Sequence, residues 1–75
     1  MTNDRAREII EQLRLSDKLN YAPTDVAELL ECRPYAINAH LDAGDTYPFE
    51  CFRINRRVKI PRGEFLRWAE AKYLL

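Results

Sequence analysis

At both ends of the chain, apolar residues recur every three or four positions, which is the spacing of one face of an α-helix. The first such segment predicts a helix over residues 4–15, which Thr2 or Asn3 can cap. The last predicts a helix that opens at Pro61, since proline suits the first turn of a helix. The residues expected on the buried faces are Ala6, Ile9, Ile10 and Leu13 in the first helix and Phe65, Leu66, Trp68, Ala69, Tyr73 and Leu74 in the last. Two amphipathic helices are therefore expected to frame the chain.

Two shorter helices are predicted in the middle of the chain, each beginning at a proline. Pro23 opens a helix expected to run to about residue 30, and Pro34 opens one expected to run to residue 43. Gly44 can end the second of them in the left-handed conformation that residues with a Cβ avoid. The buried positions expected are Val26, Ala27, Leu29 and Leu30 in the first helix and Ile37 and Leu41 in the second. The pattern thus predicts two short helices joined by a tight turn.

After the second short helix, the spacing changes to that of β-strands. Residues 49–54 and 57–60 are rich in aromatic and β-branched side chains, and Asn55-Arg56 separates them, so a hairpin is predicted. Its core-facing residues are expected to be Cys51 or Phe52, Ile54, Val58 and Ile60. Because the turn lacks the Asn-Gly or Asp-Gly pair typical of two-residue hairpin loops, the sequence leaves the strand register open.

The predicted fold class is α+β, in the order helix, helix, helix, hairpin, helix. Residues 16–21 show no periodicity and are predicted to be a connector, so residues 1–20 hold the first helix and its connector. A chain of 75 residues can build only one core, and residues 1–75 are expected to fold as a single unit. Apolar residues make up 47% of the chain and only two residues are Gly, which favours a globular domain over a disordered linker.

Several functional classes are disfavoured by the composition. No apolar stretch approaches the roughly 20 residues that span a bilayer, and the N-terminus lacks the apolar segment of a secretory signal, so a cytoplasmic protein with no membrane partner is expected. Cys32 and Cys51 lie in no metal-binding pattern and are expected to be buried, reduced thiols. His40 is expected to be a packed, hydrogen-bonded core residue rather than a metal ligand or a base. Since no catalytic triad or carboxylate pair is recognisable, neither an enzyme nor a bound metal or cofactor is expected.

Charge is segregated along a chain whose formal net charge is zero. Residues 1–50 carry five Lys or Arg against ten Asp or Glu (net −5), whereas residues 51–75 carry seven against two (net +5). Residues 53–62 (RINRRVKIPR) alone hold five of the twelve basic side chains and no acidic one. Such a segment favours a polyanion such as nucleic acid as the partner. The alternative is an edge hairpin that its charges protect against pairing with other strands.

Roughly two thirds of the chain also resembles a known family. The segments that carry the resemblance are YAPTDVAELL (21–30), similar to an opening helix, Cys32, similar to an apolar turn residue, AINAHLDAG (36–44), similar to a recognition helix with its glycine stop, and FRINRRVKIPRGEFLRW (52–68), similar to a basic wing and closing helix. Together they resemble the excisionase-like winged helix-turn-helix family, small relatives of the MerR-type DNA-binding domains. Ala22 and Glu31 depart from the pattern, which has a Ser or Thr cap and a small turn residue at these places.

The resemblance implies a small winged helix-turn-helix domain over residues 21–75: a two-helix unit, a two-stranded hairpin wing and a C-terminal helix. The helix over 34–43 would lie in the major groove of DNA, and the basic wing over 49–60 would reach the neighbouring backbone or minor groove. The candidate DNA-binding residues are Arg33, Tyr35, Asn38, Arg53, Arg56, Arg57 and Lys59. The cations can neutralise phosphates, Asn38 can pair with adenine, Arg33 with guanine, and Tyr35 can donate to a phosphate. Asp42 is poorly suited to this surface, since phosphate repels it unless it accepts from cytosine.

Two hypotheses of function follow. The first is a non-enzymatic protein that binds double-stranded DNA, which by the resemblance is an excisionase-like recombination directionality factor or a small transcriptional regulator of a mobile genetic element. It would act beside an integrase or recombinase, and a homodimer or a cooperative assembly on DNA stays open. The alternative is a protein-protein interaction module with the same fold and no specific DNA binding. Its motivation is the zero net charge and the poorly basic helix over 34–43.

Overall fold

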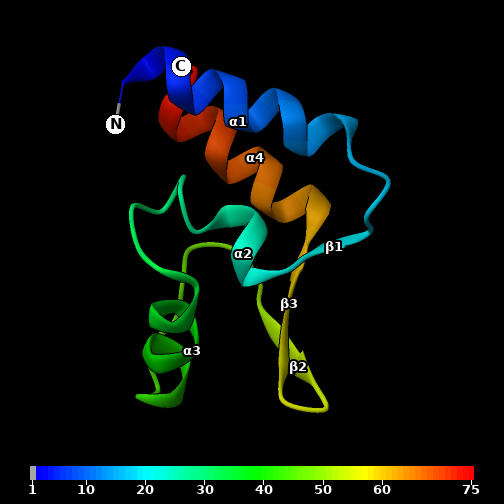
Figure 1. Cartoon of the computed structure of the whole chain (residues 1–75), viewed down its shortest axis with the longest axis vertical. Helices are drawn as coiled ribbons and strands as arrows, with labels where there is room; N and C mark the ends of the chain where they lie inside the picture. Colours follow the sequence, from blue (N-terminus) through cyan, green and yellow to red (C-terminus); the bar gives the residue numbers. More distant parts are fainter. Residues whose placement is uncertain (1) are drawn as a thin grey trace.

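Four helices and a three-stranded antiparallel sheet form the fold in the computed structural model, which describes residues 2–75 (Figure 1). Along the chain the elements are α1 (Asn3–Leu15), β1 (Asn20–Tyr21), α2 (Pro23–Val26), α3 (Pro34–Asp42), β2 (Phe52–Ile54), β3 (Arg57–Pro61) and α4 (Arg62–Tyr73). The predicted α+β class is confirmed. None of these helices is both long and apolar enough to cross a membrane, residue 1 lying outside the part described.

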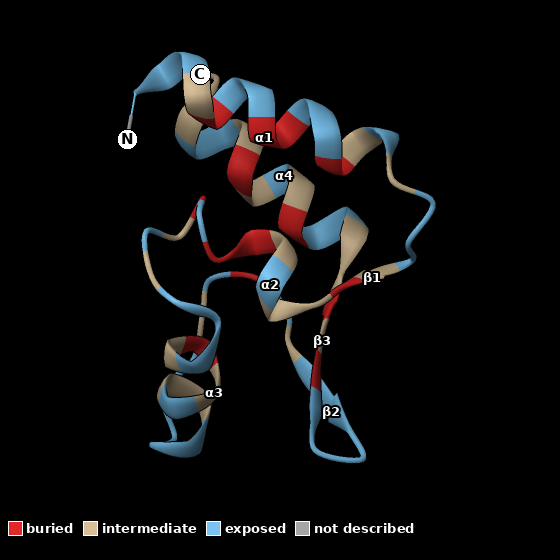
Figure 2. Ribbon diagram, in the orientation of Figure 1, coloured by how far each residue is buried: buried red, intermediate tan, exposed pale blue. Residues whose placement is uncertain are grey.

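The first and last helices pack against each other and form one side of the molecule (Figure 1). The predicted stripe of α1 is buried, and the backbone N–H of Arg5 donates to Thr2 Oγ1 over 3.2 Å, so the Thr2 cap is confirmed. On α4, Phe65 and Ala69 are fully buried, while the other apolar residues predicted there are half-buried against the same core. The buried stretches of the two helices contribute to one continuous core (Figure 2).

A short strand, β1, occupies part of the predicted connector. Tyr21 pairs with Ile60 and Asn20 with Pro61, which places β3 in the centre of the sheet order β1-β3-β2. The connector prediction was wrong here because the partner of β1 lies about 40 positions further along the chain, and no local periodicity reports it. Tyr21 is fully buried and its hydroxyl donates to the Leu13 carbonyl over 2.6 Å, which ties β1 to α1.

The second helix is shorter than predicted and ends at Val26 rather than near residue 30. Beyond it the chain continues in irregular turns, and the Cys32 N–H donates to the Ala27 carbonyl over 3.0 Å. Glu31 takes a left-handed conformation, with φ of 58°, at the turn. Leu29 is still fully buried, because apolar periodicity reports which side chains face the core and not whether the helical ladder continues.

Both short helices begin at the predicted prolines. Asp25 accepts a hydrogen bond from the Ala22 N–H over 2.8 Å, which is one half of a capping box, whereas the Ala22 side chain cannot accept the bond of the other half. α3 ends at Asp42, one residue before the predicted end, and Gly44 follows with φ of 87°. The predicted glycine stop is confirmed.

The hairpin is confirmed, but Ile54 faces the opposite way from the prediction, and of the two alternatives Cys51 and Phe52 it is Cys51 that packs against the core. Val58 and Ile60 are buried as expected, whereas Phe52 and Ile54 are exposed by 37% and 52%. Arg53 lies opposite Val58 in the ladder, so these two side chains share one face of the hairpin. Phe52 and Ile54, on either side of Arg53, therefore lie on the opposite, exposed face. Phe49, which lies before β2 rather than in it, fills the core at this end.

The cysteines and the histidine lie nearer the surface than predicted. Cys32 and Cys51 are free thiols as expected, but both are half-buried rather than buried. This partial burial is enough to raise the pKa of both thiols. His40 is also half-buried, with Nε2 3.0 Å from the Thr46 carbonyl oxygen and its ring 4.3 Å from that of Tyr47, so the predicted hydrogen-bonded packing is present.

Candidate nucleic-acid interface

α3 and the β2–β3 hairpin project in the same direction from the layer that α1 and α4 form (Figure 1). Arg53 on β2 reaches across to α3, where its Nη2 donates to the Asn38 carbonyl over 3.2 Å, so the two projections lie side by side. Much of the surface of both is exposed (Figure 2). The molecule therefore presents a helix and a hairpin together at one end.

A groove of about 340 Å³ lies between the two projections. Its lining residues are Ala22, Pro23, Thr24, Pro34, Asn38, Arg56, Arg57, Val58 and Lys59. A second hollow of about 390 Å³ adjoins it, lined by Asn38, Asp42, Arg53 and Arg56. Because Asn38 and Arg56 belong to both, the two hollows form one surface, called the α3–hairpin groove below.

Five of the seven candidate residues line this groove. They are Asn38, Arg53, Arg56, Arg57 and Lys59. The other two lie at the start of α3 and outside the groove lining: Arg33 is the N-cap residue, and Tyr35 in the first turn is 69% exposed. Thr24 was not among the predicted site residues, yet it lines the groove because α2 begins beside β3. The sequence offered one sign of this role, which is that Thr24 lies in the first turn of the helix predicted to begin at Pro23.

The basic side chains of residues 53–62 differ in what they contact. Arg62 donates to the backbone carbonyls of Arg14 and Ser16, which joins the start of α4 to the end of α1. Arg53 pairs with Asp42, with Nη2 2.5 Å from Oδ1. Within residues 2–75, Arg56, Arg57 and Lys59 form no hydrogen bond or ion pair with the protein. These three cations are available to a ligand, and all three line the groove.

The turn of the hairpin holds two residues with positive φ, Asn55 at 50° and Arg56 at 69°. Ile54 pairs with Arg57 across it, so the loop has two residues, and positive φ at both is the feature of a type I′ turn. Asn tolerates this conformation, whereas Arg, which carries a Cβ and a long side chain, is disfavoured in it. Arg56, which lines both hollows of the groove, therefore occupies a position that suits glycine.

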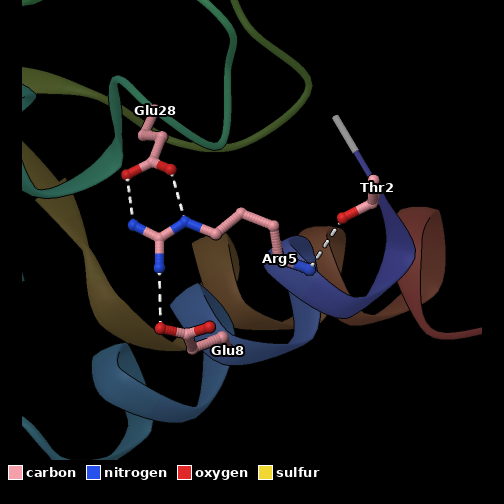
Figure 3. Close-up of polar contacts among 4 residues, drawn as sticks. All are labelled: Thr2, Arg5, Glu8 and Glu28. Atoms are coloured by element: carbon pink, nitrogen blue, oxygen red, sulfur yellow. Dashed lines mark hydrogen bonds and ion pairs between the residues drawn. The ribbon is translucent and has the colours of Figure 1, made fainter.

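A separate hollow of about 300 Å³ lies between α1 and α2, but its charged groups are paired within the protein. Arg5 donates from Nε and Nη2 to both carboxylate oxygens of Glu28, over 2.5 and 2.6 Å, and from Nη1 to Glu8 over 2.8 Å (Figure 3). These hydrogen bonds raise the pKa of Arg5 and lower that of Glu28. Across residues 2–75, His, Cys, Asp and Glu nowhere gather in a group of three or more that is able to hold a metal ion.

Comparison of the chain with protein-family models, with curated proteins and with solved structures gave no match.

Proposed function

We propose that the chain is a non-enzymatic protein that binds duplex DNA through α3 and the β2–β3 hairpin, as a winged helix-turn-helix domain does. In this proposal α2 and α3 are the helix-turn-helix unit and the hairpin is its wing. By the resemblance of residues 21–68, it is an excisionase-like recombination directionality factor or a small transcriptional regulator of a mobile genetic element. A site-specific recombinase is the corresponding protein partner.

The dimensions of α3 support this docking. Its nine residues rise about 13 Å, and a helix with side chains is about 10–12 Å across, which suits a major groove about 12 Å wide. The exposed Tyr35 and the nearby Arg33 then face the major groove of the DNA or its edge. There a hydroxyl and a guanidinium can donate to a phosphate or to a base. The hairpin meets the neighbouring backbone or minor groove with Arg56 and Arg57.

The observation that carries the proposal is the set of three unpaired cations on the α3–hairpin groove. Edge protection requires charge somewhere along an edge strand, but it does not require Arg at a left-handed turn position. Residues held in such conformations cluster at functional sites, where another requirement outweighs the conformational cost. Phosphate neutralisation is a requirement of that kind, since each neutralised phosphate releases condensed counterions.

Charge reversal tests the proposal directly. The double substitution Arg56→Glu and Arg57→Glu is expected to weaken binding to a duplex by about 100-fold or more at ~0.1 M salt, and to make the salt dependence shallower by about two phosphate equivalents. Fluorescence anisotropy with a labelled duplex, titrated across salt concentrations, measures both quantities.

A matched control reverses two cations on the other side of the molecule. Arg7 on α1 and Arg67 on α4 are exposed and lie outside the α3–hairpin groove, so Arg7→Glu with Arg67→Glu changes the net charge equally. This control is expected to weaken binding far less. Equal losses in the two double variants, or no salt-dependent binding by the unmodified protein, would contradict the proposal.

The alternative proposal is a protein-interaction module, and one observation favours it. Leu15 and Leu19, at the end of α1 and in the connector after it, are 81% and 83% exposed, which is unusual for two large apolar side chains so close in sequence. Under this alternative, the Arg56→Glu and Arg57→Glu variant keeps its biological activity. Substituting Leu15 and Leu19 with Ser abolishes that activity instead.

A further inference from the structure

The α3–hairpin groove contains one carboxylate among its described lining residues, that of Asp42. It is 2.5 Å from Nη2 of Arg53, and the same nitrogen donates to the Asn38 carbonyl over 3.2 Å. The side chains of Arg53 and Asp42 are 40% and 62% exposed. The pair therefore bridges α3 and β2 at the surface, within reach of any ligand in the groove.

The position of Asp42 has no explanation in the stability of α3 itself. Asp42 lies in the last turn of the helix, where the helix dipole presents its negative end and disfavours a carboxylate. An exposed ion pair also contributes little to folding, because solvent screens it and two long side chains lose freedom. The effect of this carboxylate is instead on the charge of the groove, because it neutralises one of its four cations.

We propose that Asp42 competes with the phosphate backbone for Arg53 and thereby limits sequence-independent binding to DNA. This inference rests on the proposed function. In the free protein, Arg53 is held by Asp42 and adds nothing to the long-range attraction of a polyanion. On a tightly fitted duplex, the guanidinium exchanges the carboxylate for a phosphate oxygen, an acceptor of the same kind.

The exchange has a cost on every duplex. Once Arg53 moves to a phosphate, Asp42 is left beside the DNA without its partner, and the backbone repels it. Only a duplex that makes compensating contacts elsewhere in the groove offsets this repulsion. Asp42 thus acts as a repulsive element against complexes that lack such compensating contacts.

The substitution Asp42→Asn tests the inference, because it keeps the shape of the side chain and removes its charge. We expect binding to a labelled random-sequence duplex to tighten by several-fold to about tenfold at ~0.1 M salt, with a salt dependence steeper by about one phosphate equivalent. The control Asp45→Asn makes the same charge change three residues after the end of α3, at a carboxylate near His40 rather than Arg53. It is expected to have a clearly smaller effect.

A double-mutant cycle separates competition for Arg53 from simple repulsion. If Asp42 acts through Arg53, the gain from Asp42→Asn largely disappears in an Arg53→Gln background. A gain of the same size in that background, no gain in either background, or weaker binding by Asp42→Asn overturns the inference while leaving the proposed function intact. Failure of the unmodified protein to bind any duplex overturns both. Thermal unfolding of each variant shows whether the fold is retained.

Discussion

Arg56 occupies a backbone conformation that glycine adopts at lower cost. Arg56 has a φ of 69° and Asn55, the residue before it, a φ of 50°. The two residues form the turn between β2 and β3. We expect Arg56→Gly to raise the free energy of unfolding by up to about 1 kcal/mol. The left-handed region costs an L-residue about 1–2 kcal/mol, and part of this gain is cancelled because glycine loses more conformational entropy on folding. Chemical denaturation measures the change.

The same substitution is expected to weaken DNA binding several-fold and to make its salt dependence shallower by about one phosphate equivalent, since one cation leaves the groove. Asn55→Gly is the control, because it alters the neighbouring turn position and removes no charge. A less stable Arg56→Gly variant would contradict the left-handed turn. A more stable variant with unchanged DNA affinity would contradict the role of Arg56 in binding.

At single positions, the sequence was informative wherever the chemistry of one residue type decides the local structure. Thr2, one of the two predicted caps, caps α1, and Gly44, which lacks a Cβ, follows α3 in the left-handed region as predicted. Ile54 was assigned to the wrong face, and the choice between Cys51 and Phe52 stayed open, because strand alternation fixes faces only once the register is known. That register depends on the turn, and Asn55-Arg56 is not a pair from which it can be read.

Between the elements, Phe49 holds the segment after α3 to the core. Its ring stacks on Tyr47 with centroids 5.1 Å apart and meets the edges or faces of Phe65 and Trp68 at 4.8 and 4.9 Å. We expect Phe49→Ala to lower the free energy of unfolding by about 3–5 kcal/mol through lost burial and a residual cavity. That loss approaches the whole stability of a small domain. Urea denaturation followed by circular dichroism measures it.

Phe52→Ala is the matched control for this prediction, since the same side chain lies three residues away and is 37% exposed. Its expected cost is well below that of Phe49→Ala. Comparable losses at the two positions would show that Phe52 is a core residue, and the hairpin register would then be wrong.

The four predicted helices are all present, and the elements that sequence reasoning missed depend on distant partners. α1, α3 and α4 have boundaries close to those predicted, because capping and apolar spacing are local properties. β1 exists only by pairing with β3, and α2 is cut short where the chain turns through Glu31 toward α3. Neither event leaves a periodic pattern in the surrounding residues.

For the whole molecule, the sequence revealed that charge is segregated along the chain, but not what each charged side chain contacts. Four of the five basic residues of 53–62 were predicted to bind DNA alike, namely Arg53, Arg56, Arg57 and Lys59. In the fold, Arg62 joins α4 to α1 and Arg53 is paired with Asp42, which leaves three cations without a protein partner among the residues that line the groove. Side-chain contacts of this kind come from residues 11 to 48 positions apart, which no motif spacing encodes.

In the acidic N-terminal half of the chain, ion pairs also hold elements together. One of these pairs predicts how stability depends on pH. Arg5 on α1 donates to both oxygens of Glu28, which follows α2 (Figure 3). These hydrogen bonds lower the pKa of Glu28, so the carboxylate binds its proton less readily in the folded chain than in the unfolded one. The stabilisation is therefore fully present above the unfolded pKa, about 4.3, and is lost as the pH falls through the lower folded value.

Replacing Glu28 with Gln is expected to lower stability at neutral pH and to flatten the decline of stability below about pH 4, because the variant has no carboxylate to protonate there. The two proteins should converge in stability as the pH falls further. Glu50→Gln is the control, since Glu50 is exposed and forms no ion pair within residues 2–75. Thermal unfolding across the acid range compares the three proteins. Parallel curves for the unmodified protein and Glu28→Gln would show that the Arg5 contact does not couple protonation of Glu28 to folding.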